Sequence, residues 1–318
     1  MKHVLVTGGA GFIGSHVVDE LLERKYSVTV FDNLASGKKE YINKKATFIK
    51  GDVSQKSQVE KLLSGSSFDV ILHIAGQPSI VNSFTNPELD FGTNFIGSVN
   101  MIMGAVKHNI DRFLYASSMT VYGNPIRLPI REEDACVPIN YYGIAKYAAE
   151  RFIHTTASRV DLESPLNVTS FRMFNVYGPR QSLTNPYQGV LAIFMGNVLR
   201  NEPITIYGDG KQARDFVYVK DVARMWVDAI ENKKSFGKVF NIGFGRQTGM
   251  LDLAKTVIHA CGKNSKTYPI LFKSTRSGDQ RFVEADITEA KKYLRFSPTT
   301  SLENGIKKTL DWAQKYAK

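Results

Sequence analysis

Short runs of β-branched and aromatic residues alternate with longer amphipathic stretches from the N-terminus to Asn175. The short runs are typical of strands, and the stretches between them carry apolar positions at helical spacing. Alternation of this kind predicts an α/β fold with a parallel, doubly wound sheet and right-handed crossovers. The predicted strands are Val4–Thr7, Ser27–Asp32, Thr47–Lys50, Val70–Ile74, Phe113–Ser117 and Asn167–Arg172, and the clearest helices are Gly14–Arg24 and Tyr142–Ala157.

The rhythm breaks beyond Asn175, which indicates a change of architecture. Turn signals interrupt shorter elements at Gly178-Pro179, Asn185-Pro186 and Gly208-Asp209-Gly210. We expect a doubly wound (Rossmann) domain over residues 1–178 and a smaller C-terminal α/β lobe over residues 179–318. The segment around residues 215–245 can pack back on the first domain.

Composition places the chain among ordinary globular proteins, with 43% hydrophobic and 22% charged residues in 318. No apolar run approaches the roughly 18 residues of a membrane span, so no membrane partner is expected. The chain enters a strand-like run directly after Met1-Lys2, which predicts no signal peptide. Two cysteines make no disulfide framework. These features predict a cytoplasmic protein.

The net charge of +11 bears on the choice of partner. Lysines and arginines are scattered without a dense block, which favours a solvated basic surface over a nucleic-acid site and also suits an anionic, doubly phosphorylated substrate. The six histidines show no metal-ligand spacing, so no metal is expected. His73 lies within an apolar run, which predicts a core histidine.

A glycine-rich turn follows the first predicted strand. Gly8, Gly11 and Gly14 have the spacing GxxGxxG, and the segment Gly11-Phe12-Ile13-Gly14 opens the first helix. In this position backbone amides and the helix N-terminus face a dinucleotide pyrophosphate.

Residues at the ends of the next strands complete the predicted cofactor site. Asp32, followed by Asn33, ends the second strand, where a carboxylate accepts hydrogen bonds from ribose hydroxyls and repels a 2′-phosphate. We therefore predict NAD rather than NADP. Further cofactor contacts are expected after the third and fourth strands, with helix capping as the alternative role for the first of them: Asp52, Val53, Ala75 and Gly76.

A tyrosine and a lysine four residues apart lie on one face of a helix, where the ammonium is expected to lower the pKa of the phenol from about 10 toward neutrality. The chain contains this spacing three times, as Tyr41/Lys45, Tyr142/Lys146 and Tyr207/Lys211. Only Tyr142 opens a long predicted helix downstream of a strand that ends in Ser117-Ser118. We therefore predict Tyr142, Lys146 and Ser118 as the catalytic group.

The chain resembles the extended short-chain dehydrogenases/reductases, and among them it is most similar to UDP-hexose 4-epimerases, including those of UDP-glucose and UDP-N-acetylglucosamine. The resemblance spans nearly the whole length through TGGAGFIG, FDNL at 31–34, GDV at 51–53, YASSMTVYG at 115–123, YYGIAK at 141–146, FNVYGPRQ at 174–181 and RDFVYVKDV at 214–222. It implies NAD as a prosthetic group, a UDP-sugar substrate and a homodimer, for which residues 87–108 and 142–157 are the candidate helices.

The position after the catalytic hydroxyl narrows the reaction. Family dehydratases carry an Asp-Glu pair there and decarboxylases a glutamate, whereas this chain has Met119 and Thr120. Without such a group, no acid or base catalyses elimination or decarboxylation of the oxidised sugar, so the remaining step is its reduction by return of the hydride. A 4-epimerase is therefore predicted. UDP-glucuronate epimerisation, another NAD-linked sugar-nucleotide conversion and an NAD-sensing regulator remain alternatives.

The resemblance also implies the substrate contacts. Thr120 is either a hydroxyl contact to the sugar or a strand-end residue that faces the core. Val283 falls where glucose-only epimerases carry a bulky tyrosine, so we expect room for a 2-N-acetyl group. The other expected contacts to the nucleotide and its diphosphate are Asn175, Val190, Tyr207, Arg214, Arg276 and Asp279.

Overall fold

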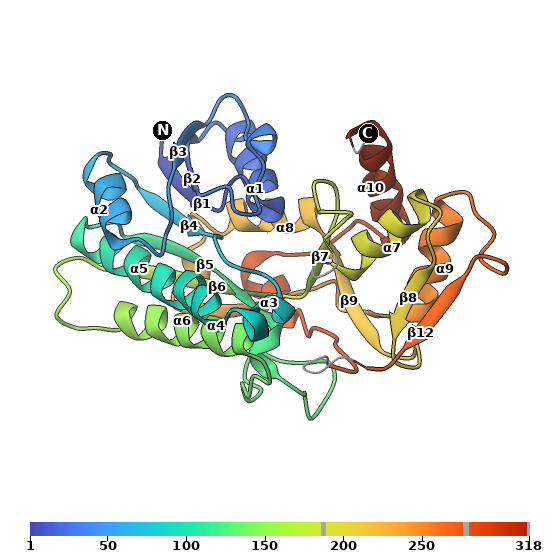
Figure 1. Ribbon diagram of the computed structural model, residues 1–318. Helices are drawn as coiled ribbons and strands as arrows, with labels where there is room; N and C mark the ends of the chain where they lie inside the picture. Colours follow the sequence, from blue (N-terminus) through green and yellow to red (C-terminus); the bar gives the residue numbers. More distant parts are fainter. Residues whose placement is uncertain (186–188, 276–279, 317–318) are drawn as a thin grey trace.

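A seven-stranded parallel sheet forms the centre of the larger part of the molecule in the computed structural model, which describes residues 1–185, 189–275 and 280–316 (Figure 1). Its strand order is β10-β6-β5-β4-β1-β2-β3. The strands are β1 (His3–Thr7), β2 (Ser27–Asp32), β3 (Thr47–Lys50), β4 (Val70–His73), β5 (Arg112–Ser118), β6 (Asn167–Met173) and β10 (Lys238–Ile242). The doubly wound α/β fold predicted from the sequence is confirmed.

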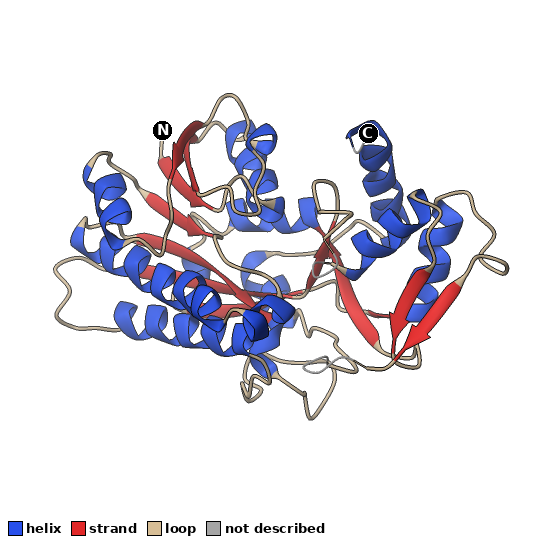
Figure 2. Ribbon diagram, in the orientation of Figure 1, coloured by secondary structure: helices blue, strands red, loops and turns tan. Residues whose placement is uncertain are grey.

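Helices cover both faces of this sheet (Figure 2). One face packs against α1 (Phe12–Glu23) and α8 (Val219–Asp228), and the other against α2 (Lys56–Ser64), α5 (Gly97–Lys107) and α6 (Tyr141–Ala157). Two buried clusters result because strands of a parallel sheet are apolar on both sides. The short helices α3 (Ile80–Thr85) and α4 (Pro87–Phe91) precede α5, and a π-helical turn over Gly92–Ile96 joins α4 to α5.

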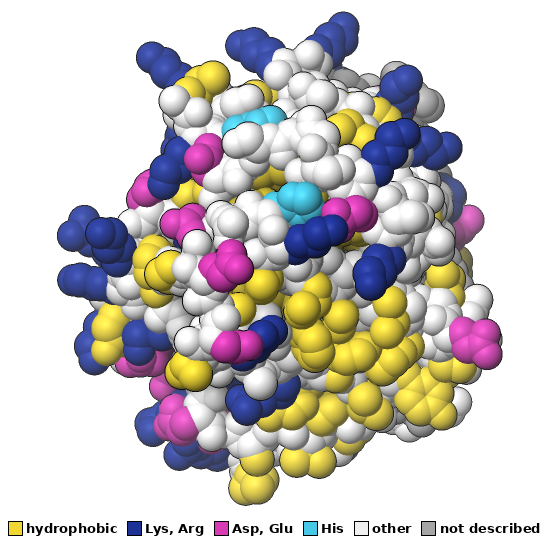
Figure 3. Space-filling model, turned by 90° about the vertical axis from the view of Figure 1, so that its left-hand side faces the viewer, with side chains coloured by type: hydrophobic (Ala, Val, Ile, Leu, Met, Phe, Trp, Pro, Cys, Tyr) yellow, Lys and Arg dark blue, Asp and Glu magenta, His cyan; other side chains and the backbone are white. Residues whose placement is uncertain are grey.

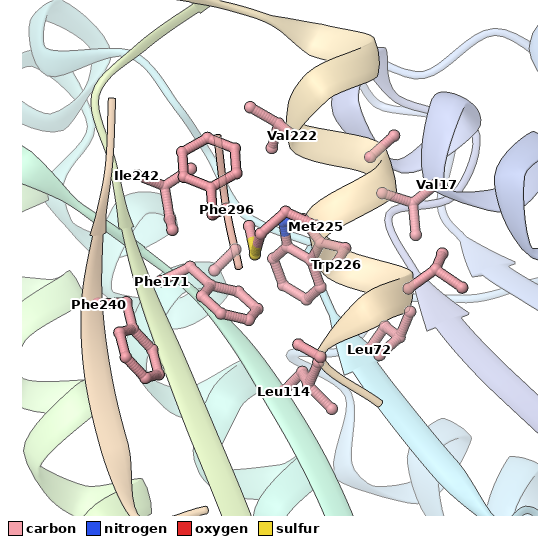
Figure 4. Packing of buried hydrophobic residues seen from close by; sticks show 14 of the residues in the cluster. Val17, Leu72, Leu114, Phe171, Val222, Met225, Trp226, Phe240, Ile242 and Phe296 are labelled. Carbon is pink, nitrogen blue, oxygen red and sulfur yellow. The ribbon is translucent and has the colours of Figure 1, made fainter. Parts of the chain in front are cut away.

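The cluster under α1 and α8 joins segments that are far apart in the sequence. Trp226 of α8 is fully buried, and its ring meets that of Phe171 of β6 edge to face with centroids 4.8 Å apart (Figure 4). Phe240 of β10 packs in the same cluster. Strand β10 pairs in parallel with β6 and forms an edge of the large sheet. Helix α8 and β10 thus belong to the larger part of the molecule, although they follow elements of the smaller lobe in the sequence.

The smaller lobe contains two small sheets and three helices around a third buried cluster. One sheet has the order β11-β9-β7 and the other pairs β12 with β8. The elements are β7 (Asn175–Tyr177), α7 (Val190–Leu199), β8 (Ile204–Tyr207), β9 (Ala213–Tyr218), β11 (Gln247–Gly249), α9 (Met250–Ala260), β12 (Ile270–Lys273) and α10 (Leu302–Tyr316). Within the described ranges, no helix is long and apolar enough to cross a membrane.

Candidate active site

The glycine-rich turn is tightly constrained at the carboxyl end of β1. Gly8 has φ +72°, and its amide donates to the Phe31 carbonyl at 2.9 Å. A Cβ on Gly14 would stand 2.1 Å from the carbonyl oxygen of Gly8, so only glycine lets α1 begin so close to the turn. Gly11, the N-cap of α1, makes no side-chain cap, which leaves amides of the first turn, such as those of Phe12 and Ile13, available to a ligand. This geometry fits a dinucleotide pyrophosphate.

Asp32 lies beside the turn and has a structural task that the sequence did not reveal. One carboxylate oxygen accepts from the Ala10 amide at 3.0 Å, and the other accepts from the Leu34 amide at 2.8 Å. Burial raises the pKa of this carboxyl above its ordinary value. The carboxylate therefore ties the end of β2 to the glycine-rich turn, at the place expected for the adenosine ribose.

The remaining predicted cofactor positions follow β3 and β4. Asp52 accepts from the Asn33 side chain at 2.9 Å and from the Ser54 amide at 2.8 Å. The capping alternative is wrong, because the N-cap of α2 is Gln55. Val53 is buried beneath α5.

Ala75 and Gly76 lie directly against the glycine-rich turn and α6. The Ala75 amide donates to the Thr7 hydroxyl at 3.2 Å, and a Cβ on Gly8 would stand 2.7 Å from the Ala75 backbone. A Cβ on Gly76 would stand 2.9 Å from Nζ of Lys146. The predicted cofactor residues after β4 and the catalytic lysine are thus brought together.

The predicted catalytic group, Ser118, Tyr142 and Lys146, comes together where β5 ends and α6 begins. Asn140 caps α6, because its side-chain oxygen accepts from the Gly143 amide at 2.8 Å. Tyr142 is half-buried in the first turn of α6 and hydrogen-bonds to Ser118. The Ser118 hydroxyl oxygen also accepts from the hydroxyl of Thr120 at 3.0 Å, and both residues are buried. Thr120 thus donates a hydrogen bond that helps to orient the Ser118 hydroxyl, whether or not it also contacts the sugar.

Lys146 lies one turn further along α6 and is 3% exposed. Its ammonium donates to the Ala116 carbonyl at 3.0 Å and lies 5.2 Å from the centre of the Tyr115 ring. Burial lowers the pKa of Lys146 to about 8, while the negative charge of Asp90 acts in the opposite direction. The lysine is held against β5 and beside Gly76.

The expected lowering of the phenol pKa of Tyr142 is wrong for the folded chain. Burial raises the pKa of Tyr142 to about 12, the hydrogen bond from Ser118 opposes this shift, and the charge of Asp90 adds to it. Lys146 directs its proton to Ala116, so desolvation dominates at Tyr142. A nearby positive charge is still required to make this phenol a base at neutral pH.

The two other Tyr-x-x-x-Lys spacings lack the helix that would align them. Tyr41 ends a single 3₁₀ turn, and Tyr207 ends β8. The prediction for His73 is confirmed: the ring is fully buried and hydrogen-bonds to Thr7 at 2.7 Å and Ser98 at 3.0 Å. In the described ranges no group of three or more His, Cys, Asp and Glu residues could hold a metal ion.

The predicted substrate positions are spread over the smaller lobe. Asn175 starts β7 and donates to the Asp215 carbonyl at 3.3 Å, while Val190 starts α7. Arg214 lies on β9 and donates to the Arg281 carbonyl at 3.2 Å. Arg276 and Asp279 lie outside the described residues.

Val283 belongs to the buried hydrophobic cluster of the large sheet and has no exposed surface. It therefore faces packed side chains and no open space. An N-acetyl group would reach it only if neighbouring groups moved.

Sequence reasoning missed the buried carboxylate of Asp215, which organises the backbone behind Arg214. Its two oxygens accept from the amides of Phe244 at 2.6 Å, Gly245 at 2.9 Å and Ala285 at 3.0 Å. Burial raises the pKa of Asp215 to about 6. The pair Arg214-Asp215 was itself the available signal, because the side chain next to Arg214 on a strand points to the opposite side of the sheet.

Together these features define a class of protein. A Rossmann-type sheet with a glycine-rich turn, an acidic end to β2 and a Ser-Tyr-Lys group is that of an extended short-chain dehydrogenase/reductase, an enzyme that uses NAD. The chain belongs to the NAD dependent epimerase/dehydratase family, which matches residues 4–243. The resemblance stated from the sequence is confirmed.

Several similar proteins are named for sugar-nucleotide epimerases. The crystal structure of a UDP-glucose 4-epimerase with UDP-glucose from Thermotoga maritima has a TM-score of 0.93 and 39% identity, over 99% of this chain and 100% of that one. A UDP-glucose 4-epimerase of Mycolicibacterium smegmatis is 33% identical over 314 residues, 97% of each chain. A UDP-N-acetylglucosamine 4-epimerase of Methanobrevibacter ruminantium, in complex with UDP-N-acetylmuramic acid, has a TM-score of 0.90 and 30% identity, over 99% of this chain and 98% of that one.

Other matches are named for different reactions or sugars. They include a UDP-glucuronic acid 4-epimerase of Bacillus cereus and a UDP-glucuronic acid decarboxylase of Arabidopsis thaliana. The family and its cofactor are therefore shown, while the sugar is not.

Proposed function

We propose that this protein is an NAD-dependent 4-epimerase of UDP-hexoses that interconverts UDP-glucose and UDP-galactose through a transient 4-keto sugar. The observation that carries this proposal is the composition of the turn after β5. Ser118 hydrogen-bonds to Tyr142, and the next two positions are Met119 and Thr120. The turn thus offers hydroxyls for proton transfer but no carboxyl group for elimination of water or for decarboxylation.

The chemistry follows from the placement of these groups. Tyr142 accepts the proton of the sugar 4-hydroxyl, and Ser118 orients that oxygen. NAD, held by the glycine-rich turn and Lys146, would supply reversible hydride transfer at C4 of the sugar. When the sugar ring has turned over about its diphosphate, the hydride would return to the opposite face of C4, and Tyr142 returns the proton to the C4 oxygen. Lys146 would supply the positive charge that the partly buried phenol needs, and an oxidised nicotinamide bound beside it would add to that charge.

A proton NMR time course of the purified protein tests the reaction. UDP-galactose is added without cofactor, and the anomeric signals of substrate and 4-epimer are followed. Conversion supports both the epimerase and a retained NAD. Absence of conversion, with NAD supplied as well, rejects the proposal, and UDP-glucuronate is then the next substrate to test.

A single substitution tests the assigned base. Tyr142→Phe removes the phenol oxygen, and we expect turnover to fall by at least about 100-fold, the scale of a lost general base, while NAD stays bound. Unchanged turnover would show that another group accepts the proton. Tyr41→Phe is the matched control, because Tyr41 has the same lysine spacing but lies in a 3₁₀ turn.

Acceptance of UDP-GlcNAc and UDP-GalNAc is the second part of the proposal, and it depends on Val283. A valine in this position leaves more volume than a tyrosine, although its side chain is packed in the core. We expect Val283→Tyr to suppress conversion of UDP-GalNAc more than that of UDP-galactose. Equal losses on both, or a lowered melting temperature, would attribute the effect to overpacking instead.

The alternatives make different products. A reductase releases oxidised or reduced cofactor in step with substrate, a decarboxylase releases carbon dioxide, and a UDP-glucuronate epimerase leaves both UDP-hexose pairs unchanged. An NAD-sensing regulator turns over none of them. The same NMR experiment separates these cases, with absorbance at the NADH band recorded in parallel.

We also propose that the protein forms a homodimer through the helices on the α5–α6 side. Exposed apolar side chains gather there (Figure 3): Leu89 and Phe91 of α4, Ile96 of the π-helical turn, Met103 of α5, and Tyr141 and Ile144 of α6. A ring contact between Phe84 of α3 and Tyr141 of α6, with centroids 5.2 Å apart, joins neighbouring helices of this face. A second copy of the same face is its natural occupant, because a two-fold interface pairs like with like.

Light scattering after size-exclusion chromatography tests the dimer. Ile144→Glu places a charge at the 45%-exposed position of α6, and we expect it to yield monomers. Val160→Glu is the control, since Val160 is fully exposed outside these helices. A monomeric wild type would reject the interface.

A further inference from the structure

A buried polar cluster lies behind the catalytic lysine and has no part in the reaction as described so far. Asp90 of α4 is 1% exposed. One of its carboxylate oxygens accepts from the side-chain amides of Gln77 at 2.8 Å and Asn94 at 2.9 Å. The other oxygen is buried and has no hydrogen-bond partner among the described residues. A carboxylate left half-satisfied in the interior is costly, which calls for a compensating positive charge.

The cluster connects Asp90 to Lys146 through Gly76. Asn94 exchanges hydrogen bonds with the backbone of Gln77: its amide donates to the carbonyl at 3.0 Å, and its oxygen accepts from the backbone N–H at 3.1 Å. This oxygen and Nζ of Lys146 lie 2.7 and 2.9 Å from the point where a Cβ on Gly76 would stand. The ammonium and the amide thus enclose the same backbone atom, and Asp90 lies directly behind the amide.

The π-helical turn explains how one helix places both polar residues toward the site. Asn94 lies in this turn and is fully buried, and its side chain bonds to Asp90 four residues earlier. Ser98, a further four residues on, donates to the Asn94 carbonyl at 2.7 Å. Such turns inside α-helices are frequent at functional sites.

Glu150, one turn further along α6, is paired with Arg172 at 2.6 Å, and the remaining titratable groups around Lys146 carry no negative charge near neutral pH. Burial lowers the pKa of His73 on β4 to about 3, so its ring is neutral. Burial raises the pKa of Tyr115 on β5 well above its ordinary value, and that of Tyr142 on α6 to about 12. Helix α3, which packs on α4 and α6, contributes no charged side chain. Burial raises the pKa of Asp90, while Gln77, Asn94 and the charge of Lys146 oppose that shift, and its carboxyl is the charged group that acts on this ammonium.

We propose that Asp90 is a positioning residue that keeps Lys146 protonated and, through Asn94 and Gln77, fixes the backbone of Gly76 beside the lysine. The proposal rests on the assignment of Lys146 to the cofactor site. A buried lysine loses its proton more readily than an exposed one, and an opposite charge nearby restores it. With Asp90 ionised, the ammonium stays available to the nicotinamide ribose and to the phenol. Loss of that charge would leave a neutral amine at neutral to alkaline pH.

The test measures the pH dependence of NAD affinity without any sugar present, so it does not depend on the epimerase reaction. The affinity of cofactor-stripped protein is followed by tryptophan fluorescence between about pH 6 and about pH 10, a range that spans the pKa of a buried lysine. In the wild type we expect affinity to fall as Lys146 loses its proton, near the pKa of about 8. Lys146→Arg should abolish this fall, because arginine does not titrate in the range.

Asp90→Asn keeps the shape and one acceptor oxygen but removes the charge. We expect the alkaline fall in NAD affinity to move about one pH unit lower, the effect of losing one nearby opposite charge. In the Lys146→Arg variant, Asp90→Asn should not change the pH dependence of NAD affinity. Glu88→Gln is the matched control, because Glu88 lies exposed on the same short helix and its loss should leave the curve unchanged.

A purely structural role gives a different result. In that case Asp90→Asn weakens NAD binding equally at every pH, without moving the alkaline fall, and the proposal is rejected. If Asp90→Asn does not fold, Asp90→Ser removes the same charge in a smaller side chain and the same shift is expected. If a folded variant without the Asp90 charge keeps the wild-type pH dependence of NAD affinity, the proposal is also rejected. If the wild type shows no epimerase activity, only the proposed reaction is affected.

Discussion

Gly14→Ala adds a single methyl group at the closest approach between α1 and the turn after β1. The new Cβ would stand 2.1 Å from the carbonyl oxygen of Gly8, 2.8 Å from its carbonyl carbon and 2.9 Å from the Cα of Gly9. All three atoms belong to the backbone, so no side-chain rotation can relieve the clash. The helix and the turn must separate, which moves the amides that face the pyrophosphate.

The magnitude follows from ordinary overpacking. Forcing an extra methyl group into a packed interior costs about 1–3 kcal/mol, which lowers the melting temperature of a protein of this size by a few degrees. The effect on the cofactor is larger, because aligned amides are the main source of pyrophosphate affinity. We expect Gly14→Ala to fold but to carry little NAD after purification and to bind added NAD at least about tenfold more weakly, a loss of roughly 1.4 kcal/mol.

The assay combines thermal unfolding with the NAD released on acid denaturation and with a titration of added NAD. Gly92→Ala is the matched control, since Gly92 is also helical and a Cβ there meets no atom within 4 Å. We expect this control to match the wild type in stability to within about 1 kcal/mol. If Gly14→Ala retained as much NAD as Gly92→Ala, the argument from close approach would be refuted.

Three further predictions concern carboxylates. Glu150→Gln breaks the buried ion pair with Arg172, in which two guanidinium nitrogens lie 2.6 and 3.1 Å from the carboxylate oxygens of Glu150. The free energy of unfolding, measured by urea titration, should fall by about 3–5 kcal/mol. Asp161→Asn, which removes a surface carboxylate paired with Arg159, should leave it unchanged. Burial raises the pKa of Asp215 to about 6, so the folded protein holds this proton more tightly than the unfolded chain, and stability should decline as pH rises from about 4 to about 6. Asp215→Asn should flatten that decline while costing about 1–3 kcal/mol throughout, because buried amide donors lose their acceptor. Asp32→Asn should bring the Kd values for NAD and NADP about tenfold closer, since it removes the charge that repels a 2′-phosphate; an unchanged ratio would show that Asp32 does not face the ribose.

The sequence predicted the sheet well because both faces of its central strands are buried. A strand such as β4 is then a short, continuous apolar run between polar segments, and its ends were found to within a residue. Helix context also distinguished Tyr142 from the two other tyrosines with the same lysine spacing, because only a helix places residues four apart on one face. The edge strand β10 was not predicted, since it pairs with β6 across more than 60 intervening residues and local periodicity does not report such pairing.

Charge effects in the site were harder to predict, because they depend on packing that local spacing does not contain. The four-residue spacing of Tyr142 and Lys146 suggested that the ammonium would stabilise the phenolate. In the folded chain the ammonium is bonded to the Ala116 carbonyl, and burial raises the pKa of Tyr142 to about 12. The same burial lowers the pKa of Lys146 and makes the charge of Asp90 matter. Since desolvation penalises both charged forms, a buried base of this kind works only when opposite charges surround it. Burial therefore favours the neutral phenol at Tyr142, and a positive charge beside it would favour the phenolate that accepts a proton.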